Sequence, residues 1–177
     1  MHAGFALQHE TGNIINQPTH ENVSTIFNSV FNVELATSPE AINEVFEVRY
    51  QVYCIDRPFE DPNCFADKRE HDAYDPRSAH ALIRHRLTGD SAATVRLVMA
   101  GDNPEQADFV CYSDSENGKR AMPYISLGLF AGILQMSVRH GITHWMAVME
   151  PAQLRLLKRF GVEFDHVGPV MEDHGRR

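Results

Sequence analysis

Regular spacing of apolar and polar residues begins near residue 21 of the chain. Residues 21–30 suit a short helix, and the alternation over 31–37 predicts a strand. Ser38 then suits a helix N-cap, with Pro39 at the first helical position. The helix that follows has apolar residues at the spacing i, i+3, i+4 and i+7, and Arg49 falls on the same stripe. The apolar members of the stripe are Ile42, Val45, Phe46, Val52 and Tyr53.

Two later runs, 79–87 and 92–99, are rich in apolar residues and are joined by Thr88-Gly89-Asp90. A connection this short that contains glycine predicts a β-hairpin. The long connection before it, 56–77, holds most of the nearby acidic residues, and connections of this length are usually functional or disordered. Residues 108–112 are expected to add one more strand.

The second half of the chain predicts a series of helix, strand, helix and strand. Residues 122–140 are apolar enough for a largely buried helix, and Gly141 suits a left-handed cap at its end. A strand is expected over 142–149, a helix from Pro151 to Gly161, and a last strand over 162–170. Together with the hairpin, this order indicates an α+β fold with a mixed, mostly antiparallel sheet flanked by helices.

The length of 177 residues fits one domain, which we place at residues 21–177, while residues 1–20 lack any period and suggest a loosely ordered arm. The net charge of -8 argues against a duplex nucleic-acid partner and against broad adhesion to anionic membranes. Three widely spaced cysteines fit neither a disulfide framework nor a zinc site, and no metal site is expected. With no apolar run of membrane-spanning length and no secretion signal, a cytoplasmic location is expected.

Two arginines stand where burial is expected. Arg49 lies on the apolar helical stripe, and Arg96 lies between apolar neighbours in the second hairpin strand. A guanidinium group stays protonated, so a buried one needs a carboxylate partner or an anionic ligand. Glu70, Asp72 and Asp75 could provide the carboxylates, and we predict that Arg49 and Arg96 converge with Glu70, Asp72 or Asp75 on one cleft. The alternatives are arginines that reach solvent at the rim and an acidic run that is simply a solvated loop.

The ordered series of segments resembles the exosortase/PEP-CTERM-associated acyltransferases. These are related to N-acyl amino acid synthases and, more distantly, to acyl-homoserine-lactone synthases. The resemblance covers the chain from about Phe31 onward. The segments that carry it are RYQVYC, PFED, REHDAYD, SAHALIRHR, ATVRLV, YISLGLFAGIL, GITHWMAVMEP, LLKRFGVEF and GPVMEDHGRR.

The resemblance implies a GNAT-type fold that moves a long-chain fatty acyl group from acyl-carrier protein to the amine of an amino acid or related small molecule. Positions that match the family's substrate pocket are Arg49, Phe59, Glu70, Asp72, Asp75 and Arg96. Glu105 matches the glutamate of the strand where the thioester is attacked, and we assign it the role of general base. Glu105 and Arg96 are therefore the catalytic candidates. An exposed loop position is the alternative for Glu105.

No permanently bound cofactor is expected, and the donor implied by the resemblance is the acyl-phosphopantetheine group of acyl-carrier protein rather than acyl-CoA. Because carrier proteins are acidic and this chain is acidic too, docking requires a local basic surface. Two places qualify. The first is Lys119 with Arg120, and the second is Arg155, Lys158 and Arg159.

Asp108 stands where the family has an arginine, and the segment that follows is shorter than in the family. These departures leave a degenerate acyl-binding or partner-binding module as an alternative function. A small-molecule N-acetyltransferase that uses acetyl-CoA is the other. A glycine-rich phosphate-binding turn would favour it, but Gly128 and Gly132 lie inside the apolar helix, where they are expected to allow close packing.

Overall fold

The computed structural model describes residues 20–99, 110–114, 122–147, 151–159 and 161–165. Its centre is a four-stranded antiparallel sheet in the order β1-β2-β3-β4. The strands are β1 (Phe31–Leu35), β2 (Ser78–His85), β3 (Ser91–Val98) and β4 (Val110–Asp114). Each strand pairs with the next one in the chain, so the sheet is a meander, and the expected hairpin is its centre. The expected 108–112 strand is found as β4, and residues 108 and 109 lie outside the described residues.

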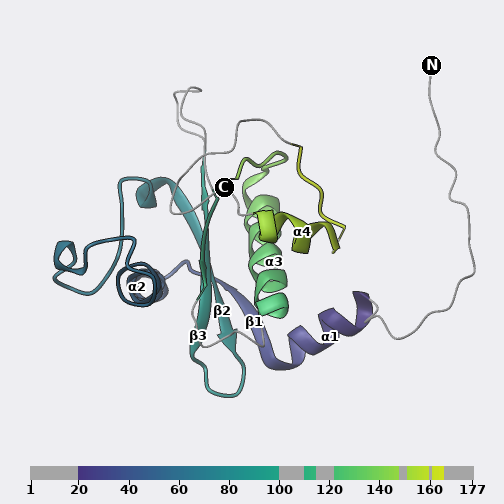
Figure 1. Ribbon diagram of the computed structural model, residues 1–177, viewed down its shortest axis with the longest axis horizontal. Coiled ribbons are helices and arrows are strands. Elements are labelled where there is room, and N and C mark those ends of the chain that lie inside the picture. Colours follow the sequence, from purple (N-terminus) through teal and green to yellow (C-terminus); the bar gives the residue numbers. More distant parts are fainter. Residues whose placement is uncertain (1–19, 100–109, 115–121, 148–150, 160, 166–177) are drawn as a thin grey trace, which may run out of the picture.

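Helices cover both faces of this sheet (Figure 1). Helix α2 (Pro39–Tyr50) lies on one face, and α3 (Met122–His140) lies on the other, with α1 (His20–Val30) and α4 (Pro151–Arg159) on the same side as α3. Successive side chains of a strand point to opposite faces, so β2 can serve both layers. Ala81 and Ile83 pack in the core under α3, whereas Leu82 packs with Val45 under α2. The α+β prediction with a flanked, mostly antiparallel sheet is confirmed.

The two glycines inside α3 allow close packing, as expected. A Cβ atom at Gly128 would lie 2.5 Å from Cε2 of Phe27, which comes from α1. A Cβ atom at Gly132 would lie 3.1 Å from Cβ of Ala81 and 3.2 Å from Cγ1 of Val95. Glycine at these positions therefore lets α3 approach both α1 and the sheet.

The C-terminal part corrects the predicted strands. Residues 142–147 and 162–165 form no strand, although both segments were expected to begin one. Their apolar side chains are still used, because Trp145 packs against the main core and Val162 packs near Leu157 of α4. Hydrophobicity predicts burial, whereas a strand also requires a neighbouring backbone to pair with. The remaining parts of the two predicted strands lie outside the described residues.

The predicted ends of the last two helices are close to the observed ones. Gly141 follows α3 with φ +68°, and Gly161 lies just beyond α4 with φ +78°. Both values are in the left-handed region that glycine adopts without a steric penalty. Among the described helices, none is long and apolar enough to cross a membrane. The expected N-terminal arm falls outside the described residues, except for its last residue, which begins α1.

Candidate functional site

Helix α2 places Arg49 against the sheet. The helix begins at the predicted N-cap, where the Ser38 side chain accepts a hydrogen bond from Ala41 N at 3.2 Å. Ala41, Val45 and Arg49 are its buried residues, four positions apart, so all three lie on one face. The face continues into a π-helix, Gln51–Asp56, in which Val52 is also buried. Arg49 is thus held in an apolar stripe and is only 4% exposed.

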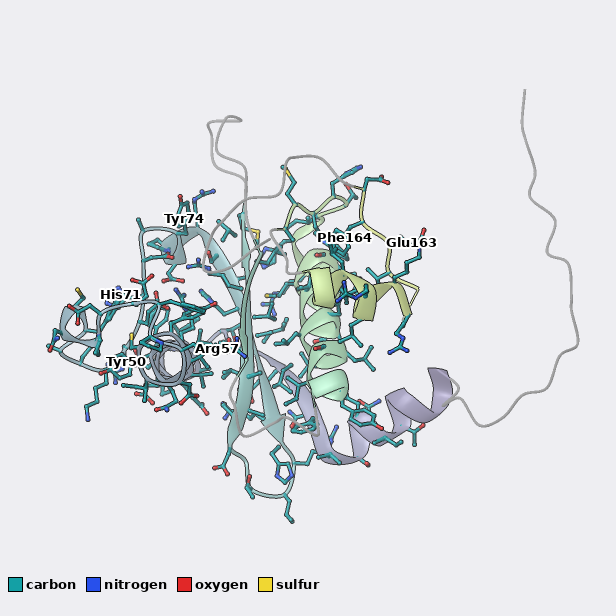
Figure 2. All side chains as sticks on the ribbon, in the orientation of Figure 1. Tyr50, Arg57, His71, Tyr74, Glu163 and Phe164 are labelled. Atoms are coloured by element: carbon teal, nitrogen blue, oxygen red, sulfur yellow. The ribbon has the colours of Figure 1, made fainter. Side chains whose placement is uncertain are left out.

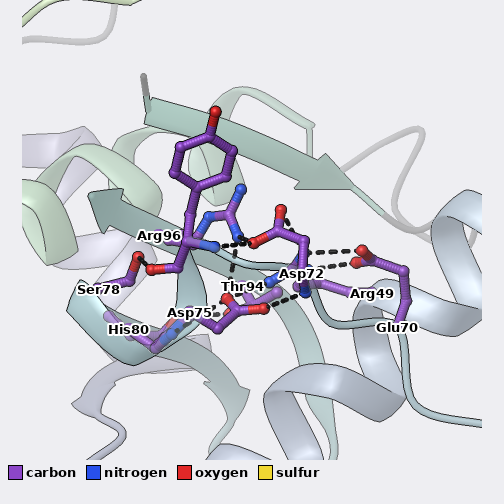
Figure 3. Close-up of polar contacts among 10 residues, drawn as sticks. Arg49, Glu70, Asp72, Asp75, Ser78, His80, Thr94 and Arg96 are labelled. Carbon is purple, nitrogen blue, oxygen red and sulfur yellow. Dashed lines mark hydrogen bonds and ion pairs between the residues drawn. The ribbon is translucent and has the colours of Figure 1, made fainter. Parts of the chain in front are cut away.

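Carboxylates surround the Arg49 guanidinium group (Figure 3). Its Nε donates to Glu70 Oε2 at 2.5 Å, and its Nη2 donates to Glu70 Oε1 at 2.9 Å. Its Nη1 donates to Asp75 Oδ1 at 2.7 Å. A two-fold bond between arginine and a carboxylate is the strongest geometry for such a pair. All three nitrogens of Arg49 therefore donate to acidic side chains of this chain.

The acidic side chains reach Arg49 because the connection before β2 is attached to α2. Glu70 N donates to Phe46 O at 3.0 Å, which fixes the start of the acidic run beside the helix. Asp75 Oδ2 then accepts from Asp72 N at 2.7 Å, and Asp72 Oδ1 accepts from Tyr74 N at 2.8 Å. These short-range bonds fold the run into a tight turn, and its carboxylates point toward the sheet.

Arg96 joins the same group from β3. Its Nη1 donates to Asp72 Oδ1 at 2.7 Å and to Asp75 Oδ1 at 2.9 Å. Asp75 Oδ1 is therefore shared by both arginines. The prediction that the two arginines converge on these acids is confirmed, and all three acids take part. We call Arg49, Glu70, Asp72, Asp75 and Arg96 the charged cluster.

The charged cluster holds two positive and three negative side chains, which leaves one negative charge in excess. Four of its side chains are almost fully buried, with 5% to 8% exposure. The Asp72 side chain is 35% exposed, and its Oδ2 lies 3.7 Å from Arg49 Nη2. Asp72 is consequently the member of the cluster that is open to a partner from solvent.

The pKa values of the cluster reflect burial and charge together. Burial raises the pKa of Glu70 against the opposing effect of Arg49. Burial would also raise the pKa of Asp75, but Arg49, the Asp72 N–H and Arg96 together hold it below its ordinary value. Asp75 is thus kept ionised as the bridge between the two arginines.

Two neighbours of the cluster, Tyr74 and His80, had no role predicted from the sequence. The Tyr74 ring lies 6.0 Å from the guanidinium carbon of Arg96 and 5.1 Å from that of Arg77, within the range of cation–π contacts. His80 Nε2 lies 3.5 Å from Asp75 Oδ1, and His80 is 3% exposed. His80 and Arg96 are register partners in the hairpin. The sequence predicts the hairpin but not its register. With the register known, His80 would have been placed beside Arg96.

The other predicted site residues lie elsewhere or outside the described residues. Phe59 is 38% exposed and stands near Tyr53, with 6.4 Å between the ring centroids. Glu105, Lys119 and Arg120 are not among the described residues, and neither is Asp108. The basic residues of α4, which are Arg155, Lys158 and Arg159, are exposed.

The basic surface of α4 and the charged cluster do not meet on one face of the sheet. Tyr74, beside the cluster, lies on the α2 side of the sheet, whereas Glu163, just beyond α4, lies on the α3 side (Figure 2). Lys158 Nζ lies 3.5 Å from Glu163 Oε1, and both side chains are largely exposed. Such an ion pair contributes little to stability, so Lys158 remains available to an acidic partner.

No group of three or more His, Cys, Asp or Glu side chains within the described ranges has the arrangement of a metal site. Both cysteines with described side chains, Cys54 and Cys64, are free thiols. In the charged cluster the carboxylate oxygens accept hydrogen bonds from the two arginines, so they are not arranged around a common point as metal ligands would be. Its chemistry is that of an ion-pair network that is open at Asp72.

Comparison with known proteins supports the fold. The sequence model of the acetyltransferase (GNAT) domain matches residues 48–128, a little under half of the chain, and this segment contains the whole charged cluster. An acyl-CoA N-acyltransferase from Pseudomonas aeruginosa is similar in structure, with a TM-score of 0.56 and 13% identity over 82% of this chain and 93% of that one. A predicted acetyltransferase from Clostridium acetobutylicum, solved with acetyl-CoA, has a TM-score of 0.52 and 11% identity over 80% of this chain and 96% of that one. Among curated proteins, no sequence matches this chain. The chain has a GNAT-like fold.

Proposed function

We propose that this protein is a GNAT-type N-acyltransferase that moves a long-chain fatty acyl group from acyl-carrier protein to the amine of an amino acid or related small molecule. The GNAT-like fold and the match over residues 48–128 support the transferase class. The observation that carries the proposal is the charged cluster, a buried network with one excess negative charge and one accessible carboxylate. The identity of the donor rests on the resemblance to acyltransferases and on the basic residues of α4. The identity of the acceptor rests on the resemblance and on the accessible carboxylate.

The cluster favours recognition of the acceptor through its ammonium group. From the sequence, two arginines suggest a grip on an acceptor carboxylate, as a guanidinium can bind it through two parallel bonds. All three nitrogens of Arg49 instead donate to Glu70 and Asp75. The accessible group is the Asp72 carboxylate, which attracts a cation. We therefore assign Asp72 to binding of the acceptor amine, with Arg49, Glu70, Asp75 and Arg96 holding its position.

The proposed reaction is aminolysis of a thioester. A base takes a proton from the ammonium group, the free amine attacks the thioester carbonyl carbon, and the carrier thiol leaves with a proton. Glu105 is the proposed base. The Asp72 carboxylate would bind the protonated form before attack. Phe59, whose ring is exposed, is kept as a proposed substrate contact on the strength of the resemblance alone.

The proposed donor partner is acyl-carrier protein, which would dock through the basic residues of α4 or through Lys119 and Arg120. Charges farther apart than about 8 Å are largely screened at physiological ionic strength, so acyl transfer from carrier protein should slow as salt is added. The double reversal Arg155→Glu with Arg159→Glu should raise the KM for acyl-carrier protein. The same variant should leave the rate with a short acyl-pantetheine substrate unchanged. Equal, salt-independent rates with acyl-carrier protein and acyl-CoA would overturn this choice of donor.

Lipid extracts of a host that overexpresses the protein provide the test. Mass spectrometry should find an N-acylated amine that is absent with the Asp72→Asn variant. In vitro, palmitoyl carrier protein should acylate L-leucine methyl ester, which has an ammonium group and no carboxylate. N-acetyl-leucine, which has the carboxylate alone, is the matched control and should not compete. No acylated product with any donor would favour the alternative of a degenerate binding module.

A small-molecule N-acetyltransferase that uses acetyl-CoA is the second candidate. The matched family model and the acetyl-CoA-bound structural neighbour favour it. Calorimetry separates the two proposals, because this candidate requires tight binding of acetyl-CoA. Tight binding of acetyl-CoA, with no rate advantage for acyl-carrier protein, would establish it.

A further inference from the structure

His80 is a buried titratable residue to which the proposed reaction gives no role. It lies on β2, and its ring stands edge-on to Phe46 of α2, with 6.0 Å between centroids and an interplanar angle of 89°. Its Nε2 faces Asp75 Oδ1 at 3.5 Å. Its Nδ1 is buried without a hydrogen-bond partner among the described residues. The ring thus lies between the Phe46 ring and the Asp75 carboxylate.

The charges around His80 decide its protonation state. Asp75 and Asp72 face it from the turn before β2, Arg49 faces it from α2, and Arg96 faces it from β3. Burial, together with both arginines, lowers the pKa of His80 from 6.5 to about 4, against the opposing effect of the two aspartates. At neutral pH the imidazole therefore carries one proton. Nε2 is the site of that proton because Nε2 faces a carboxylate oxygen, which accepts but cannot donate.

Asp75 Oδ1 is the centre on which these groups meet. Arg49 Nη1 at 2.7 Å, Arg96 Nη1 at 2.9 Å and His80 Nε2 at 3.5 Å all approach this one atom. The second oxygen, Oδ2, holds the backbone N–H of Asp72. A rotation of the Asp75 carboxylate would break the bridge between the arginines and release the turn that carries Asp72. His80 is the third group, besides the two arginines, that contacts this oxygen.

We propose that His80 is a positioning residue of the acceptor site, which as a neutral imidazole with its proton on Nε2 holds the Asp75 carboxylate and thereby keeps Asp72 directed at the acceptor amine. This inference rests on the proposed function for the identity of the acceptor. The state of the imidazole and its contact with Asp75 are independent of that function.

The first experiment needs no substrate. Long-range ¹H–¹⁵N correlation spectra of the ¹⁵N-labelled wild-type protein should show His80 as the neutral Nε2–H tautomer between roughly pH 5 and pH 8. The Asp75→Asn variant should shift the His80 Nε2 signal. A protonated imidazolium at pH 7, the Nδ1–H tautomer, or a spectrum unchanged by Asp75→Asn would overturn the proposal.

The second experiment separates positioning from a merely structural role. With palmitoyl carrier protein and L-leucine methyl ester, His80→Phe should raise the acceptor KM about tenfold, because the Asp75 carboxylate loses its polar contact with Nε2. The KM for the carrier protein should not change. His80→Gln, whose amide nitrogen can replace Nε2, should recover most of the loss. His85→Phe, the same replacement on the same strand, is the matched control. Equal effects of His80→Phe and His80→Gln would contradict a positioning role. So would a rise in the KM for the carrier protein as well as for the acceptor.

The two experiments also distinguish a failure of this inference from a failure of the proposed function. If no donor and acceptor give a product, the proposed function fails, and the spectra still decide the state of His80. If the product forms but the spectra show an imidazolium or the other tautomer, the proposed function stands and the role of His80 is refuted.

Discussion

Two arginine-centred groups attach helix α2 to the same face of the sheet, and they differ in burial. The charged cluster does so near the C-terminal end of α2 through Arg49. Near the N-terminal half, Arg84 of β2 donates to Glu44 of α2 at 2.6 Å and to Glu34 of β1 at 2.5 Å. Both groups pair guanidinium with carboxylates in two-fold geometry. The Arg84 side chain is 20% exposed, and those of Glu34 and Glu44 are 41% and 33% exposed.

This difference decides what each group can do. When Arg84 is removed, Glu34 and Glu44 can return to water at little cost. When Arg49 is removed, Glu70 and Asp75 stay in a desolvated place with no compensating charge. The Arg84 group is therefore a structural attachment at the surface. The charged cluster is costly to keep assembled and leaves one carboxylate accessible, which is the property expected of a binding site rather than of a stability device.

The largest effect should come from Arg49→Met, which keeps much of the side-chain volume and removes the charge. We expect it to lower the free energy of unfolding by about 3 to 5 kcal/mol, as for other broken buried ion pairs. Chemical denaturation measures this value at neutral pH. A loss below about 1 kcal/mol would mean that the acids reach solvent and that the cluster is no more buried than the Arg84 group.

Acid should weaken the charged cluster through His80. The pKa of His80 is lowered from 6.5 to about 4 in the folded protein, so the unfolded chain binds the proton more readily. Above pH 6.5 the imidazole is neutral in both the folded and the unfolded chain, and the folded protein keeps its full stability. As the pH falls toward 4, the unfolded chain takes up the proton first, and stability is lost. The difference between the two pKa values corresponds to a change of about 3 kcal/mol in the free energy of unfolding. Unfolding curves of His80→Phe, compared with wild type across this range, should show a flatter dependence on pH, and parallel curves would contradict this prediction.

Removing both partners should cost less than removing one. The double variant Arg49→Met with Glu70→Met leaves the net charge of the cluster unchanged. It should therefore be more stable than Arg49→Met alone, with a coupling free energy of about 2 kcal/mol. A double-mutant cycle by chemical denaturation measures this term. Strict additivity of the two substitutions would show that Glu70 is not the principal partner of Arg49.

The smallest effect is expected at the surface group. Arg84→Met should lower the free energy of unfolding by about 1 kcal/mol, since its partners are partly exposed. This loss should shrink further as salt is added, whereas the loss for Arg49→Met should change little. Thermal unfolding at low and high salt tests both variants side by side. Equal salt dependence would remove the distinction between the two groups.

Much of the first half of the fold could be predicted from local pattern. The Ser38 cap, the apolar stripe of α2 and the hairpin all depend on contacts between residues close in sequence, and each is observed. The strands expected over 142–149 and 162–170 were wrong in their described parts, because pairing depends on a distant backbone. Of the site, the convergence of Arg49 and Arg96 with the acids followed from the need to compensate buried charge. The proposed base Glu105 stays a prediction.

From the sequence alone, two arginines stand where burial is expected, and a buried guanidinium requires an acidic partner because it keeps its charge. Which carboxylate oxygen pairs with which guanidinium nitrogen depends on the tertiary structure. Asp75 became the shared bridge, Asp72 the accessible carboxylate, and His80 a neutral neighbour on the adjoining strand. Those roles depend on differences of a few ångströms between similar carboxylates. Local pattern cannot distinguish them, since distance and burial are set only when the turn before β2, helix α2 and the hairpin pack together.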